Sequence, residues 1–109
     1  MDSRLPAHLE VSAMIRAVEA AGGFAAVLHK GERSGGTIVV ILAEKGVNPR
    51  LFERMPELDG SRKWTCVRIH DVDNKAEFDD YLTRRRYQDP DLWIIELDIA
   101  NGERFIVST

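Results

Sequence analysis

Residues 24–70 read FAAVLHKGERSGGTIVVILAEKGVNPRLFERMPELDGSRKWTCVRIH, and this stretch decides the fold because strand-like runs alternate in it with turn residues. The run Thr37–Ala43 (TIVVILA) is apolar at both alternating positions and rich in β-branched residues, which predicts a central strand covered on both faces. A first strand is expected at Phe24–Lys30, and the glycine-rich residues 31–36 predict a hairpin loop between these two strands. The stretch therefore predicts a β-sheet of short strands.

Three further strands are expected along the chain. The segment Arg50–Met55 (RLFERM) is more polar and is followed by Pro56, which has no N–H for a ladder, so it predicts a short strand near a sheet edge. The next strand is expected at Lys63–His70, where side chains alternate between two faces. The segment Leu92–Ile99 (LWIIELDI) shows the clearest alternation and predicts a strand that returns to the sheet.

Helical periodicity flanks the central strands on both sides. Apolar residues recur at three- and four-residue spacing between about Ala7 and Ala21, and a second helix is expected from the Asn74–Glu77 capping pair to about Gln88. The tail at 101–109 predicts a last strand or a short helix. The expected fold class is therefore α+β: an N-terminal helix, an antiparallel meander of about four strands, a second helix and a returning C-terminal strand, with the helices on one face of the sheet.

The composition is that of a soluble globular protein with one domain, spanning residues 1–109. The chain is 44% hydrophobic and 30% charged, and its net charge of −3 argues against a dedicated nucleic-acid binder. Its one cysteine, Cys66, excludes an internal disulfide. The N-terminus lacks a signal-peptide pattern, and no apolar run approaches the roughly 18 residues of a membrane span. We therefore expect a cytoplasmic protein that does not bind membranes.

Three motifs resemble reactive or ligand-binding sites, and each lacks a part that the chemistry requires. The segment 31–37 (GERSGGT) has neither the lysine nor the following helix of a phosphate-binding P-loop. Cys66 and His70 share a strand face but are separated by roughly 13 Å of strand, too far for a nucleophile and its base. The segment 70–73 (HDVD) could hold a divalent cation, but acids before a helix also offset its dipole. The sequence therefore predicts no catalytic residue, metal site or cofactor, and favours a protein that is not an enzyme.

Basic residues form the most conspicuous charge run, at Arg84–Arg86. Acidic residues cluster at the start of the same predicted helix, so this polarity complements the helix dipole at both ends. A surface that binds anions or nucleic acid is the alternative, and it requires basic residues from several segments to converge. The candidate residues for such a surface are Arg50, Arg54, Arg62, Lys63, Arg84, Arg85 and Arg86.

Aromatic residues on the predicted strands suggest a binding surface. Trp64 lies on the more polar face of its strand, where it either packs beneath a helix or lies at an interface. Together with the lack of a catalytic motif, this favours a non-catalytic module that binds a protein, a second copy of the chain being one candidate. One alternative is the basic surface, and another is a small-molecule enzyme whose site is assembled from distant residues. The first candidates for that site are His29, His70, Asp71 and Asp73.

One segment resembles a known family. The segment 89–97 (DPDLWIIEL) resembles the closing part of a small alphaproteobacterial family of unknown function, DUF1491, and the segments 11–13 (VSA), 22–27 (GGFAAV) and 35–40 (GGTIVV) are similar to its opening half. Family members often carry a tryptophan just before VSA, where this chain has Glu10, and paired arginines in the first helix, where it has Arg16 alone. The resemblance spans most of the chain and implies a cytoplasmic bacterial protein of one domain. It implies no activity, so no site residue follows from it.

Overall fold

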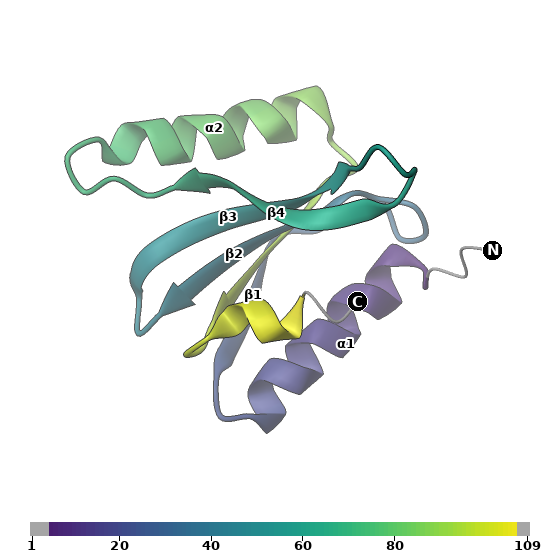
Figure 1. The fold of residues 1–109 in the computed structure, drawn as a ribbon, viewed down its shortest axis with the longest axis horizontal. Coiled ribbons are helices and arrows are strands. Elements are labelled where there is room, and N and C mark those ends of the chain that lie inside the picture. Colours follow the sequence, from purple (N-terminus) through teal and green to yellow (C-terminus); the bar gives the residue numbers. More distant parts are fainter. Residues whose placement is uncertain (1–4, 107–109) are drawn as a thin grey trace.

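The computed structural model describes residues 5–106, which form a five-stranded mixed sheet with two long helices (Figure 1). In chain order the elements are α1 (Ala7–Ala20), β1 (Phe24–His29), β2 (Ile38–Glu44), β3 (Val47–Pro56), β4 (Arg62–Ile69), α2 (Lys75–Gln88), β5 (Trp93–Asp98) and the short 3₁₀-helix η1 (Gly102–Phe105). The α+β class and the order of helix, four strands, helix and strand are confirmed. Of the two structures expected for the tail, a strand or a short helix, residues 102–105 form the short helix, and residues 107–109 lie outside the described residues.

The strand order is β1-β5-β2-β3-β4, and this corrects the hairpin expected at residues 31–36. The strand β5 lies between β1 and β2, antiparallel to the first and parallel to the second. Residues 31–36 therefore cross over an inserted strand instead of closing a hairpin. Turn residues mark where a chain reverses, but the pairing partner is chosen by contacts with a segment more than fifty residues away.

The strand β3 is longer than the short strand expected, and it lies next to the edge strand, as predicted. It spans ten residues, Val47–Pro56, and pairs with both β2 and β4. Pro56 stands at the last ladder position, opposite Arg62, where the missing N–H costs little. The true edge on this side of the sheet is β4.

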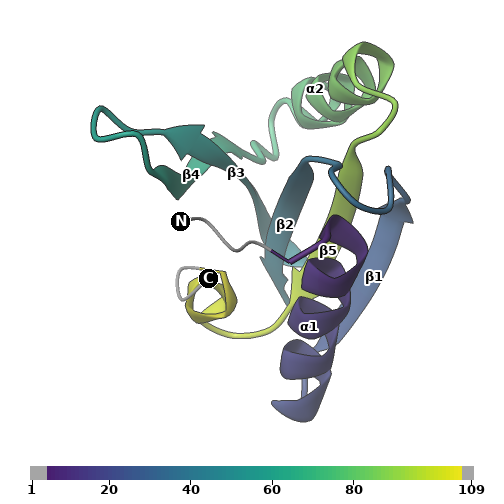
Figure 2. The same ribbon diagram turned by 90° about the vertical axis from the view of Figure 1, so that its right-hand side faces the viewer.

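The two helices cover opposite faces of the sheet, not one face as expected (Figure 2). Alternation along β2 explains this arrangement, because Val40 and Leu42 pack in the α1 cluster whereas Val39 and Ile41 pack in the α2 cluster. Every residue from Ile38 to Ala43 is buried, which confirms the predicted central strand. A strand that is apolar on both faces must be covered on both faces, and each helix covers one face of β2.

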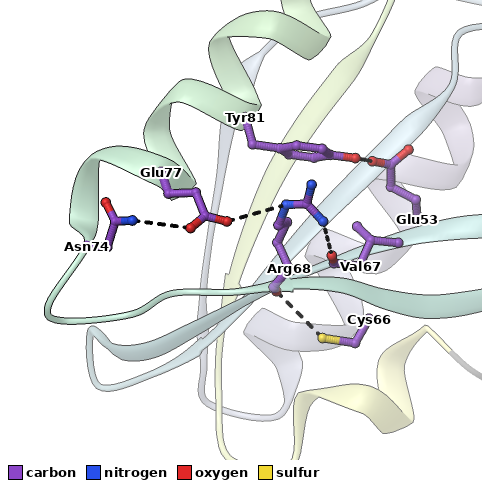
Figure 3. A network of polar contacts seen from close by, with 7 residues as sticks. All are labelled: Glu53, Cys66, Val67, Arg68, Asn74, Glu77 and Tyr81. Atoms are coloured by element: carbon purple, nitrogen blue, oxygen red, sulfur yellow. Dashed lines mark hydrogen bonds and ion pairs between the residues drawn. The ribbon is translucent and has the colours of Figure 1, made fainter.

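The helix α2 covers its face with few buried residues. Phe78 is its one buried residue, and Tyr81 and Leu82 are partly buried. The predicted end at Gln88 is confirmed. Asn74 occupies the N-cap position, but its side chain contacts the Glu77 carboxylate at 3.3 Å and makes no capping bond to the backbone (Figure 3). Within residues 5–106, no helix is long and apolar enough to cross a membrane.

Candidate functional site

The two edges of the sheet differ sharply in chemistry. The β4 edge carries Arg62, Lys63 and Arg68, and charged edge residues oppose pairing with another strand. The β1 edge is Phe24–His29 (FAAVLH), whose first five residues include no charged residue and no proline. Within the described part of the chain β1 pairs with β5 alone, so the backbone groups on its other side have no strand partner. The β1 edge therefore lacks the charged residues and prolines that oppose strand pairing.

Apolar side chains lie exposed along the β1 edge. Phe24 is 78% exposed, Leu28 50% and Val27 43%. Ala25 packs against the α1 cluster, so alternation places Phe24 and Ala26 on the face opposite α1. The helix α2 packs over β2, β3 and β5 and leaves Phe24 uncovered. A β-bulge at Leu28 interrupts the pairing of β1 with β5, and the ladder from Phe24 to Val27 is regular.

Arg54 is held on the α1 side of the sheet. Its guanidinium donates two hydrogen bonds to the Glu10 carboxylate of α1, at 2.7 and 3.0 Å, and lies 4.7 Å from the centre of the Trp64 ring. Both charged side chains are largely buried, with 15% of Arg54 and 9% of Glu10 exposed. Trp64 is itself buried in the cluster that contains α1, and its role at an interface stays a prediction.

Arg85 is held on the opposite face, where Glu53 fastens α2 to the sheet. Arg85 donates to the Glu53 carboxylate at 2.9 Å, and the Tyr81 hydroxyl donates to it at 2.8 Å. Arg68 lies 4.5 Å from the centre of the Tyr81 ring and 4.0 Å from Glu77 of the same helix (Figure 3). Burial, and then the hydrogen bond to Glu53, raise the pKa of Tyr81. Contacts that join α2 to β3 and β4 are therefore largely polar.

The remaining candidate basic residues lie apart from these two. Arg50 pairs with Glu103 of η1, and Arg84 lies 6.0 Å from the centre of the Tyr81 ring. Arg62 and Lys63 are exposed at the start of β4, and Arg86 is exposed on α2. The seven candidate residues are thus distributed over both faces and the β4 end of the sheet. Since Arg50, Arg54 and Arg85 are each paired with a carboxylate, the structure does not bring the set together as one basic surface.

The candidate enzyme residues are not brought together either. His29 ends β1 and shares a cavity of about 330 Å³ with residues of the last turns of α2. His70, Asp71 and Asp73 precede the first turn of α2, and a helix of 14 residues spans roughly 21 Å. Among residues 5–106, no group of three His, Cys, Asp or Glu side chains is placed to hold a metal ion.

The Arg50–Glu103 pair predicts an acid-sensitive contribution to stability. The hydrogen bond from Arg50 holds the pKa of Glu103 below its ordinary 4.5, so the pair stabilises the fold at neutral pH. This contribution is lost as the pH falls below 4.5 and through the lowered pKa of Glu103. We expect Arg50→Gln to destabilise the protein at pH 7 and to be less damaging below pH 4.5. Urea unfolding of both proteins across this range checks it, and a difference that does not change with pH would contradict it.

Comparisons with known proteins agree on one family. The model of a family described as "Protein of unknown function (DUF1491)" matches residues 5–107. The crystal structure of a DUF1491 family protein from Caulobacter crescentus CB15 is similar at 31% identity and a TM-score of 0.80, covering 94% of this chain and 95% of that one. An NMR structure of a DUF1491 family protein from the same organism has 30% identity and a TM-score of 0.76, covering 93% and 91%.

A third solved structure is also similar along most of its length. The solution structure of protein Atu0922 from A. tumefaciens shares 31% identity and a TM-score of 0.71, covering 90% of this chain and 88% of that one. No curated protein matches the chain. The resemblance noted in the segments 11–13, 22–27, 35–40 and 89–97 is thereby confirmed over nearly the whole sequence.

Proposed function

The chain belongs to the DUF1491 family, whose function is unknown, and from that premise we propose that it is a non-catalytic interaction module that forms a homodimer through the β1 edge. One observation carries the proposal: Phe24–Leu28 is an uncharged edge strand with three large apolar side chains exposed. Pairing would satisfy the outward backbone groups of β1. Fully burying an exposed large apolar side chain contributes about 1.5–3 kcal/mol, so covering Phe24 and the exposed parts of Val27 and Leu28 favours association.

The choice of a second copy as the partner follows from charge. Two-fold pairing sets residues of one strand against residues of the same strand, and like charges directly opposite each other destabilise a sheet. Phe24–Leu28 meets this condition because it carries no charge. The β4 edge meets it less well, because pairing two copies of β4 would bring the like charges of Arg62, Lys63 and Arg68 together along one seam. Two sheets joined at β1 would leave the charged β4 strands as the outer edges of the dimer.

Light scattering and sedimentation equilibrium test the homodimer with a matched pair of variants. Ala26→Lys places a charge in the middle of the β1 edge, and Thr65→Lys places the same charge on β4; both positions are exposed. We expect the unchanged protein and Thr65→Lys to dimerise at high micromolar concentration, and Ala26→Lys to dimerise at least about tenfold more weakly. A monomeric unchanged protein, or a dimer indifferent to Ala26→Lys, would sink the proposal.

Nucleic-acid binding has less support than dimerisation, and a separate measurement tests it. Arg54 and Arg85 are each neutralised by a largely buried carboxylate, which leaves fewer cations for phosphate contacts. Affinity for phosphate backbones falls steeply with salt, so retention on a nucleic-acid column at low salt and release at high salt would favour this alternative. An enzyme has less support still, since His29 and the acids before α2 lie at opposite ends of that helix.

A further inference from the structure

The faces and exposure of the β1 residues also indicate in which register two copies of this strand would pair. We propose that β1 pairs antiparallel with its own copy in a register centred on Ala26, which packs the partner's Leu28 against Phe24. This inference rests on the proposed homodimer and adds its register and its main apolar contact. Figure 2 shows β1 as the border of the molecule on its side, with α1 over the face of the sheet.

The faces of β1 restrict the possible registers. Ala25 and Val27 stand opposite Leu97 and Ile95, which belong to the α1 cluster, so both point to the α1 face. Phe24 points to the other face. In an antiparallel pair, residues directly opposite each other point to the same face. A two-fold axis that relates two antiparallel strands of one sheet is perpendicular to that sheet, so each residue and its copy point to the same face. Because neighbouring residues of a strand point to opposite faces, residue i cannot lie opposite the copy of residue i+1. The axis must therefore pass beside one residue, which faces its own copy.

The possible centres on β1 differ in what they pair, and a centre at Leu28 would fall on the β-bulge. A centre at Ala25 pairs residues 24–26 only. A centre at Val27 leaves Phe24, the most exposed side chain of the strand, outside the ladder. A centre at Ala26 pairs residues 24–28, keeps the whole regular stretch 24–27 inside the ladder and sets Phe24 opposite the partner's Leu28. This register covers the two most exposed apolar side chains of β1 with one contact.

Disulfide cross-linking distinguishes the registers. Directly opposite residues have Cβ atoms about 4.5–5.5 Å apart, close to the reach of a disulfide, and a residue at the two-fold centre meets itself. The background is Cys66→Ser, because the native thiol is exposed. Oxidation of two facing thiols by diamide, which is itself reduced, then joins the copies. We expect Ala26→Cys to give a covalent dimer on a non-reducing gel, and Ala25→Cys and Val27→Cys to remain uncross-linked.

A second measurement tests the apolar contact. Leu28→Ala should raise the dissociation constant of the dimer by about tenfold or more, whereas Leu58→Ala, at a fully exposed turn residue, should leave it unchanged. Preferential cross-linking through Ala25→Cys or Val27→Cys, or a dimer indifferent to Leu28→Ala, would overturn the register while the homodimer stands. If the Cys66→Ser protein stays monomeric at high micromolar concentration, the homodimer itself falls.

Discussion

Replacing Glu10 with alanine is expected to lower the free energy of unfolding by about 3–5 kcal/mol, because removing one partner of a buried ion pair leaves the other charge uncompensated. Arg54 donates two hydrogen bonds to Glu10, and only 15% of its side chain is exposed. The guanidinium also lies over the Trp64 ring, so without Glu10 a largely buried positive charge remains against that ring. Alanine is the best helix former, so the helical propensity of α1 is not reduced.

Urea unfolding at pH 7 measures this effect against two references. Glu103→Ala removes the acid from the more exposed Arg50 pair, with 33% and 43% of the two side chains exposed, and should cost at most about 1 kcal/mol. The double variant Glu10→Leu with Arg54→Met removes both charges and should recover much of the loss, because apolar replacements for a buried pair are often neutral. Equal costs for Glu10→Ala and Glu103→Ala would show that burial does not set the value of the Arg54 pair.

Replacing Glu53 with alanine is expected to release α2 from the sheet. The variant leaves the Tyr81 hydroxyl and Arg85 without their shared acceptor, and breaking such a buried pair costs about 3 kcal/mol or more. The helix has little else to hold it, since Phe78 is its one buried residue. The loss should therefore appear first as local opening of α2, at a free energy below that of global unfolding.

Hydrogen exchange followed by mass spectrometry resolves this local opening. Peptides from α2 should exchange faster in Glu53→Ala, while peptides from β2 should keep most of their protection. Glu77→Ala is the matched control on the same helix, because its contact with Arg68 is long and 58% of its side chain is exposed. Uniform loss of protection along the chain, or equal effects of the two variants, would refute the idea that Glu53 holds α2 against the sheet.

Tyrosine titration gives an independent readout of the same contact. Burial and the hydrogen bond to Glu53 raise the pKa of Tyr81 above its ordinary 10.0, so this tyrosine stabilises the fold in neutral form and that contribution is lost as the pH rises through its raised value. In Glu53→Ala the titration of Tyr81 should move down in pH.

Glu10 and Glu53 show how far sequence patterns reach at charged positions. Glu10 falls on the buried stripe of α1, three residues after Ala7 and four before Met14. This spacing is the signal that could have identified it as an acid with a partner inside the protein, and it was missed. Its partner Arg54 could not be identified, since 44 residues separate the two and several arginines were available. The basic residues looked like one candidate surface in the sequence because pairing across the fold was invisible there.

For the β1 edge too, some features can be identified from the sequence and others depend on the tertiary structure. Its lack of charge and its apolar residues can be seen directly in FAAVLH, whereas their exposure cannot. That this strand is an edge depends on β5 entering between β1 and β2, and on α2 covering the other half of the sheet. No local pattern contains this information, because it depends on which distant strands complete the pairing of β2.

Local patterns alone determined the α+β class, the positions of the elements and the burial of β2 on both faces, since hydrophobic period and turn chemistry act over a few residues. Tertiary structure decided the strand order, the placement of the helices on opposite faces and the carboxylate each arginine meets. These outcomes follow from contacts between residues about thirty to seventy positions apart. Their energies depend on the burial and geometry of the assembled sheet, which no single segment specifies.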